Sequence, residues 1–150
     1  MRDRMEKIAR LHPDARCEVT AKTSHILMQQ ATAGMVASGT ATLEAAYFSL
    51  PFVLLYKAAW LTFLIGRRLV KVKWLGMPNI LADREVVREF LQEDARPQAI
   101  AAEVAPFLDD PQARATFQQN LRPVIAKLGS PGASDRAAEA ILSALDSPFS

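Results

Sequence analysis

The 150-residue sequence predicts an α/β protein with a parallel sheet, followed by a helical C-terminal region. Two apolar runs, residues 35–37 and 52–56, have the length of buried strands, and a helix-like segment at residues 41–48 lies between them. Strand, helix and strand in this order form the unit of a parallel sheet, because parallel neighbours need a crossover connection. Half of the residues are hydrophobic and 23% are charged, so residues 1–150 are expected to fold as one globular domain.

The turn between the first predicted strand and the helix consists of Ser38, Gly39 and Thr40. A small-residue turn that enters a helix leaves backbone N–H groups available to a phosphate, and a glycine lets the backbone approach the ligand closely. Glu44 lies one turn inside the helix, where a carboxylate can accept hydrogen bonds from a ribose diol. The same residues also fit an ordinary helix cap, so the local pattern leaves both interpretations open.

Downstream of this unit, the pattern predicts mostly helices. Pro111 fits the first position of a helix, and Pro123 is expected to interrupt that helix. The alanine-rich last helix is expected to close the fold, where it can pack tightly, although the C-terminal helices could equally serve self-association. The predicted helices cover residues 85–92, 97–108, 113–128 and 134–145.

Two further segments are candidates for ligand contact. Tyr56 and Lys57 end a predicted strand, and the carboxyl ends of parallel strands line the ligand crevice in such sheets. Lys57 can balance a diphosphate charge or simply be solvated. The Pro78–Asn79 pair is expected in an irregular loop, where the Asn79 amide either binds sugar hydroxyls or forms an ordinary turn.

Several polar residues are expected to have no catalytic or metal-binding role. The lone cysteine, Cys17, is expected in a short strand at residues 17–20 as a buried, inert thiol, and it excludes an internal disulfide. His12 and His25 lack metal-ligand spacing, and His25 is expected to be a cap or cleft-lining residue. No cofactor is expected, and no catalytic base is identified. Solvated helix faces explain the carboxylates of Asp83, Glu85, Glu89 and Glu93.

The charge pattern bears on partners and location. A net charge of +2, without interleaved basic and aromatic residues, argues against nucleic acid. The charged N-terminus does not resemble a secretory signal, which favours the cytoplasm. Residues 45–66 are largely apolar, but Pro51 and Lys57 argue against a spanning helix. Residues 59–69 precede a basic cluster, so this predicted helix either lies on an anionic membrane surface or packs on the sheet.

Three longer stretches carry a family resemblance. They are SGTATLEAA at residues 38–46, LPFVLLYK at residues 50–57, and RRLVKVKWLGMPNILADREVVREFLQEDARP at residues 67–97. Over residues 25–146 the chain resembles the C-terminal, donor-binding half of lipid-A-disaccharide synthase, and the MPNILADREVVREFLQ stretch is the most specific part. Asp83 departs from the pattern, where a glycine is expected.

The resemblance implies a partial Rossmann-like sheet from the C-terminal domain of a GT-B glycosyltransferase. It implies a UDP-2,3-diacylglucosamine donor and a 2,3-diacylglucosamine 1-phosphate acceptor, which are joined into a β-1,6 disaccharide with release of UDP. It also implies a peripheral position on the inner membrane, no metal, and dimerisation through C-terminal elements. Together with the strand-end residues Tyr56 and Lys57, the residues that the resemblance favours for substrate binding on the donor side are Ser38, Gly39, Thr40, Glu44 and Asn79.

The family needs a second, acceptor-binding domain, for which this chain has no counterpart. The resemblance therefore implies a half-enzyme that is a fragment, a split-gene subunit or a stand-alone module, working as a homodimer or beside a separate acceptor-domain partner. Two alternatives remain open. One is a non-catalytic module that binds a nucleotide sugar, and the other is a structural or interaction domain in which the 38–40 turn is merely a helix cap.

Overall fold

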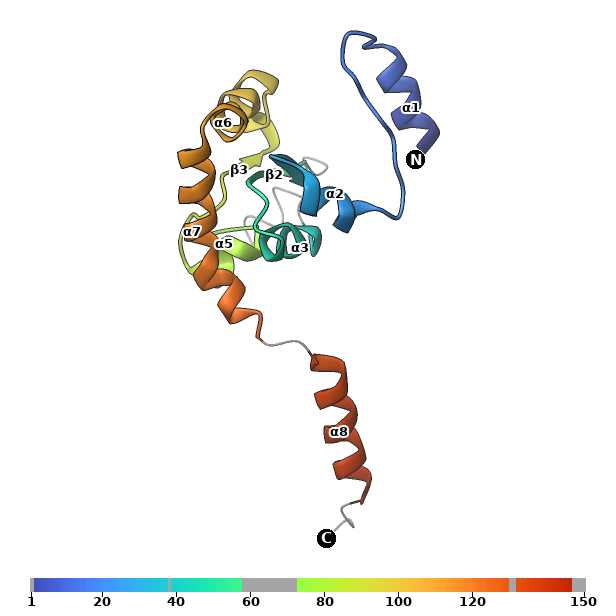
Figure 1. Cartoon of the computed structure of the whole chain (residues 1–150), viewed down its shortest axis with the longest axis vertical. Coiled ribbons are helices and arrows are strands. Elements are labelled where there is room, and N and C mark those ends of the chain that lie inside the picture. The colour runs from blue at the N-terminus through green and yellow to red at the C-terminus, as the bar shows by residue number, and fades with distance from the viewer. Residues whose placement is uncertain (1, 38, 58–72, 130–131, 147–150) are drawn as a thin grey trace.

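The structure is a computed structural model, and it describes residues 2–37, 39–57, 73–129 and 132–146 (Figure 1). A small sheet lies at the centre of the molecule, with helices around it, while the first and last helices project away from this body. In chain order the elements are α1 (Arg2–Arg10), α2 (Ser24–Gln30), β1 (Gly34–Ala37), α3 (Ala41–Tyr47), β2 (Phe52–Tyr56), α5 (Met77–Ala82), β3 (Glu89–Leu91), the 3₁₀ helix η1 (Gln92–Asp94), α6 (Pro97–Asp109), α7 (Pro111–Lys127) and α8 (Ala133–Asp146).

Within the described residues, the sheet has three parallel strands in the order β1-β2-β3. Gly34 pairs with Phe52 at the start of the first pair, and Leu54 pairs with Glu89 in the second. The predicted α/β class and the strand, helix and strand unit are therefore confirmed. The arrangement is consistent with part of a Rossmann-like domain of the GT-B type.

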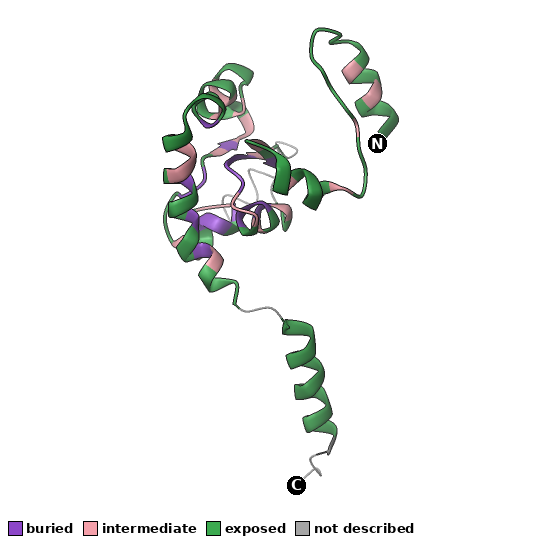
Figure 2. Cartoon of the chain, in the orientation of Figure 1, coloured by how far each residue is buried: buried purple, intermediate pink, exposed green. Residues whose placement is uncertain are grey.

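The core forms around β2, the central strand. Phe52, Val53 and Leu54 are fully buried, as expected for a parallel strand with both faces covered (Figure 2). Helix α7 packs against this strand through an aromatic contact, in which the Phe117 ring lies edge-on to Phe52 at a centroid distance of 6.0 Å. Phe107 of α6 contacts Phe117 in the same way at 5.1 Å, so both helices share one apolar cluster.

The helix predicted at residues 85–92 is wrong. Residues 89–91 form β3 instead, paired with β2, and Val86 and Val87 are buried just before it. The apolar spacing in this segment fits one face of a helix, but β-branched and aromatic side chains also suit a strand. The strand forms because it pairs with β2. This pairing is a long-range contact, which the local sequence pattern does not reveal.

Three other local expectations are corrected. Pro78 and Asn79 belong to helix α5 rather than to an irregular loop, and Pro78 lies in its first turn, where a proline is tolerated. Cys17 is exposed in a non-regular segment instead of buried in a strand. Pro123 does not interrupt α7, which runs continuously over 17 residues. A proline inside a helix costs one backbone hydrogen bond, and the buried side chains of α7 compensate for this loss.

The last helix also differs from its expectation. α8 was expected to pack tightly, yet Ile141, Leu142 and Leu145 are 60–76% exposed. Figure 2 shows the helix exposed along its length and separated from the body. Its alanine-rich composition therefore serves no packing within the described part of the chain.

The structure tests the membrane-spanning alternative only in part. Residues 45–47 end α3 and residues 52–56 form β2, so this part of the apolar run belongs to the sheet unit. Across the described ranges, no helix combines the length and apolar content needed to cross a bilayer. The predicted interfacial helix at residues 59–69 lies outside the described residues.

Asp83 ends helix α5 in the left-handed conformation, with φ 51° and ψ 29°. Glycine adopts this conformation without strain, and aspartate is among the few other residues that tolerate it. The position where the sequence analysis expected a glycine is thus a left-handed helix end, and aspartate is compatible with its geometry.

We expect replacements of Asp83 to rank by their tolerance of positive φ. Asp83→Gly should keep or raise the free energy of unfolding, whereas Asp83→Val should lower it by about 1–2 kcal/mol. Urea denaturation of the three proteins measures this order. Equal stabilities of the valine variant and the parent would contradict the left-handed geometry.

Candidate functional site

The candidate site lies at the carboxyl edge of β1 and β2. Ala37 pairs with Leu55, so the turn after β1 and the end of β2 emerge side by side. Gly39 and Thr40 are both exposed in that turn. Ser38, the first residue of the predicted turn, lies outside the described residues. This edge is where parallel α/β sheets place their ligands.

Gly39 has φ 141°, a conformation that strongly favours glycine. A Cβ built on Gly39 would meet none of the described residues within 4 Å, so the turn is open to solvent on that side. The amides of Thr42 and Leu43 already donate to the carbonyls of Gly39 and Thr40, at 3.1 and 2.9 Å. An anion at this turn must therefore use the N–H groups that precede Thr42.

Thr42 holds the turn in place, a role that the sequence analysis missed. Its side chain is fully buried, and its hydroxyl donates a hydrogen bond of 2.7 Å to the Gly39 carbonyl. A threonine that bonds a carbonyl three residues earlier is a known local pattern, so this spacing was a usable signal.

Glu44 is exposed in the first turn of α3 and forms no ion pair with any described residue. A carboxylate near a helix N-terminus is stabilised by the helix dipole, which is a sufficient structural reason for it. Its negative charge also opposes an anion placed directly at the same helix end. A ligand that contacts both elements would place a neutral hydroxyl group, not a phosphate, beside Glu44.

Tyr56 and Lys57 occupy the end of β2. Tyr56 is half-buried and packs against the core, while Lys57 is exposed just beyond the strand. The structure thus brings the Gly39–Thr40 turn and these two residues to one edge of the sheet.

Unlike the exposed residues of the turn and Lys57, Asn79 lies in the protein interior. Its side chain is fully buried and bonded to protein groups in all four of its hydrogen-bonding directions. The carbonyl oxygen accepts from the backbone N–H groups of Val86 and Val87, at 2.8 and 2.9 Å. The amide donates to the Val87 carbonyl at 2.7 Å and to the Glu89 carboxylate at 2.8 Å. In this conformation Asn79 supports the backbone and has no group left for a sugar.

Glu89 is the second member of this buried network, and the sequence analysis wrongly assigned it to a solvated helix face. Its carboxylate also accepts from the backbone N–H groups of Leu75 and Gly76, with shortest distances of 3.0 and 2.8 Å. Gly76 is required here, because an added Cβ would lie 2.6 Å from Leu54 Cδ1 and 3.0 Å from Glu89 Oε1. Since β3 was predicted as a helix, the inward direction of Glu89 could not be recognised.

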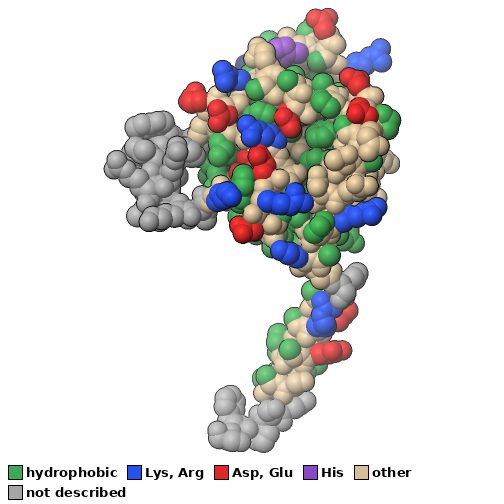
Figure 3. Space-filling model, turned by 90° about the vertical axis from the view of Figure 1, so that its left-hand side faces the viewer, with side chains coloured by type: hydrophobic (Ala, Val, Ile, Leu, Met, Phe, Trp, Pro, Cys, Tyr) green, Lys and Arg blue, Asp and Glu red, His purple; other side chains and the backbone are tan. Residues whose placement is uncertain are grey.

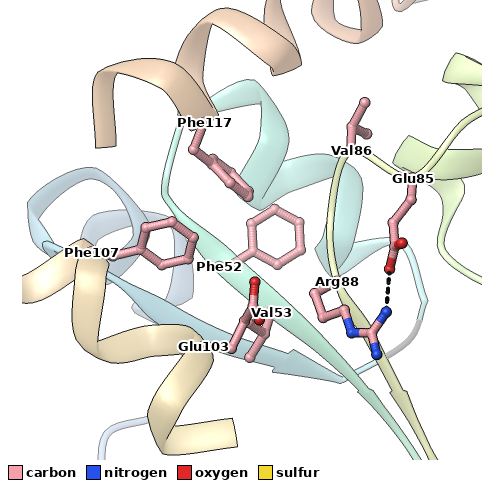
Figure 4. Close-up of a pocket in the computed structure, with 8 residues that line it drawn as sticks. All are labelled: Phe52, Val53, Glu85, Val86, Arg88, Glu103, Phe107 and Phe117. Carbon is pink, nitrogen blue, oxygen red and sulfur yellow. Dashed lines mark hydrogen bonds and ion pairs between the residues drawn. The ribbon is translucent and has the colours of Figure 1, made fainter. Parts of the chain in front are cut away.

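A separate cavity of about 220 Å³ lies near the opposite end of the strands (Figure 4). Phe52, Phe107 and Phe117 line one side of it, and the ion pair between Arg88 and Glu85, at 3.2 Å, lies at another. Phe52 begins β2, whereas the candidate site follows the ends of β1 and β2. The cavity is therefore not part of that site.

Charge and metal-binding groups give no second candidate in the described ranges. On the face shown in Figure 3, lysines and arginines are interspersed with aspartates and glutamates. No cluster of three or more histidine, cysteine, aspartate or glutamate side chains suited to a metal ion occurs among the described residues.

The fold and the site define a class: an α/β protein with a parallel sheet and an open glycine turn at its carboxyl edge, as in Rossmann-like ligand-binding domains. Sequence comparison then identifies the family. The family profile described as lipid-A-disaccharide synthetase matches residues 2–144. The chain belongs to the lipid-A-disaccharide synthase family, as the resemblance implied.

Individual relatives agree with the profile. A lipid-A-disaccharide synthase from Persephonella marina is 42% identical over 118 residues, which are 79% of this chain and 31% of the relative. One from Sulfurihydrogenibium sp. is 42% identical over 82% of this chain and 32% of its own length. One from Anaeromyxobacter dehalogenans is 47% identical over 73% of this chain and 29% of its own length. The chain thus spans about a third of the length of these relatives.

We expect Asn79→Asp to destabilise the protein strongly. The new oxygen would face the Val87 carbonyl and the Glu89 carboxylate, so two buried hydrogen bonds become repulsive contacts that cost about 3 kcal/mol or more. Urea denaturation measures the loss. Adding Glu89→Gln should recover part of it, because it removes one of the two charges. A double variant no more stable than the single one would contradict this network.

We expect Thr42→Val to lower the free energy of unfolding by about 1 kcal/mol, because the Gly39 carbonyl loses its hydroxyl donor. Thr42→Ser keeps the hydroxyl and is the matched control. Hydrogen exchange of the Thr42 and Leu43 amides should quicken in the valine variant only. Equal exchange in both variants would show that the hydroxyl does not hold the turn.

Proposed function

We propose that this chain forms the donor-binding half of a lipid-A-disaccharide synthase. The observation that most directly supports this proposal is the open Gly39–Thr40 turn beside the end of β2, in a chain that belongs to this family. The proposed ligand is the UDP group of UDP-2,3-diacylglucosamine. Its diphosphate would contact Gly39, Thr40 and the neighbouring Ser38, and its ribose diol would bond Glu44.

The other candidate residues receive distinct roles. Lys57 is exposed at the same edge and would balance part of the diphosphate charge, and half-buried Tyr56 would form a wall of the site. Asn79 would act indirectly, because its buried hydrogen bonds hold the segment that leads into β3. These assignments separate ligand contact from positioning, and each can be tested by a single substitution.

In the proposed reaction, the 6-hydroxyl oxygen of 2,3-diacylglucosamine 1-phosphate attacks C1 of the donor sugar. The bond between C1 and the diphosphate oxygen breaks, and UDP leaves with the electron pair. N–H groups at the turn and the Lys57 cation would stabilise the charge that develops on UDP. The hydroxyl proton must pass to a base, and none of the residues assigned here supplies it.

The acceptor is a lipid, so the proposal places the reaction at the cytoplasmic face of the inner membrane. The sequence of residues 59–69, with its following basic cluster, is the proposed contact with anionic lipid. The exposed apolar side chains of α8 are available for a homodimer or for an acceptor-binding partner.

A non-catalytic module that binds a nucleotide sugar is the second candidate. It is favoured because none of the residues assigned here supplies a base for the acceptor hydroxyl. Such a module would bind UDP without turnover. A purely structural domain would not bind UDP.

We expect the purified chain to bind UDP saturably in calorimetry. Glu44→Ala should weaken binding about 10- to 100-fold, which corresponds to the loss of hydrogen bonds to a charged group. Glu103→Ala removes the same charge from an exposed site on α6 and is the matched control. A folded chain without UDP binding would reject the proposal, and equal losses in both variants would reject the role of Glu44.

A further inference from the structure

We propose that the cavity at the start of β2 binds a small organic cation, a primary amine whose apolar body has about the size of one aromatic ring. We call this cavity the amine pocket. Its floor contains Phe52, Phe107 and Phe117, and its mouth carries Glu85, Arg88 and Glu103. The pocket lies away from the 39–44 turn, so the proposal stands whether or not that turn binds a nucleotide.

The floor of the amine pocket is apolar and large enough for a ring. Phe52 is fully buried, and Phe107 and Phe117 are only 8% and 9% exposed. Phe117 contacts both other rings edge-on, so rings from β2, α6 and α7 form one surface. The cavity volume of about 220 Å³ exceeds the roughly 150 Å³ at which an apolar cavity takes up benzene. The floor therefore accepts one aromatic ring or an aliphatic group of similar volume.

The charged side chains at the mouth determine the sign of the ligand. Glu85, Arg88 and Glu103 are all exposed. Arg88 is already paired, since its guanidinium lies 3.2 Å from the Glu85 carboxylate and 5.8 Å from the centre of the Phe90 ring. Glu103 forms no ion pair with any described residue. Two carboxylates and one guanidinium leave the mouth negative, so it attracts a cation and repels an anion.

The position of Glu103 connects the charge to the apolar floor. Glu103 lies one turn before Phe107 in α6, so both side chains project from one face of the helix. Figure 4 shows the Glu103 side chain pointing toward the Phe52 ring. An ammonium group bound to this carboxylate would lie beside aromatic rings, which attract cations through their faces. An amine with an apolar body therefore gains contacts at both of its ends.

Other classes of ligand fit the amine pocket less well. A phosphate or carboxylate would meet Glu85 and Glu103, and the only cation at the described mouth, Arg88, is already paired. A sugar needs several hydrogen-bonding groups around its ring, and phenylalanine side chains supply none. A metal ion needs more ligands than this mouth offers, because no cluster of three suitable side chains occurs among the described residues. A neutral apolar molecule fits the floor but leaves Glu103 without a partner.

The test is a titration of the whole chain, followed by the chemical shifts of its backbone amides in NMR spectra. The probe is phenethylammonium, and 2-phenylethanol is the neutral counterpart of the same size. The amine should bind with a Kd of about 1 mM, as expected for so small a ligand, and should shift the amides of Val53, Phe107 and Phe117. The alcohol should bind about fivefold more weakly, because it lacks the charge.

Two variants separate the charge from the apolar floor. Glu103→Gln should weaken amine binding about fivefold and leave alcohol binding within about twofold, because it removes only the carboxylate charge. Asp109→Asn is the matched control, since it removes an exposed carboxylate from the same helix, outside the amine pocket. It should leave both affinities within about twofold.

The proposal is overturned if the amine does not bind, if its shifts lie outside the amine pocket, or if amine and alcohol bind equally. It is also overturned if Asp109→Asn weakens amine binding as much as Glu103→Gln does. The titration contains no UDP, so failure of the donor site leaves its outcome unaffected.

Discussion

The bond network of Glu89 and Asn79 is the constraint on which the described body depends. One half-buried carboxylate accepts hydrogen bonds from two backbone amides before α5 and from Asn79, and Asn79 in turn binds the backbone before β3. A carboxylate that is partly removed from water is costly unless such donors surround it. The network therefore connects the start of α5 to β3, and β3 lies against the strand that leads into the candidate site.

Local signals were sufficient for the part of the fold that surrounds β1 and β2. The two strands and α3 are adjacent in sequence, so their apolar periods and the small-residue turn predicted them without long-range information. The β3 segment and α5 could not be predicted in this way. Val86, Val87, Phe90 and Leu91 fit a helix face and a strand equally well, and only pairing with β2 separates the two.

The candidate site shows the same division between local and long-range signals. Gly39 and Glu44 were identified from the turn and its helix, and the structure places both in exposed positions. The position of Asn79 was not predictable, because its four hydrogen bonds go to three residues of one segment seven to ten residues away. Sequence reasoning selects residues by their chemistry, and it therefore treats a buried amide and an exposed one alike. Burial here turns a candidate ligand contact into a support for the backbone.

Among the described residues β1 pairs only with β2, and the Gly39 turn of the candidate site follows β1 directly. An edge strand held by one neighbour opens locally at a lower free-energy cost than a strand held by two. A turn attached to such a strand samples more conformations. A ligand that binds only one of these conformations has a lower apparent affinity, in proportion to the fraction of molecules that adopt it. The buried Thr42 hydroxyl opposes this loosening from the helix side, because its 2.7 Å hydrogen bond to the Gly39 carbonyl ties the turn to the start of α3.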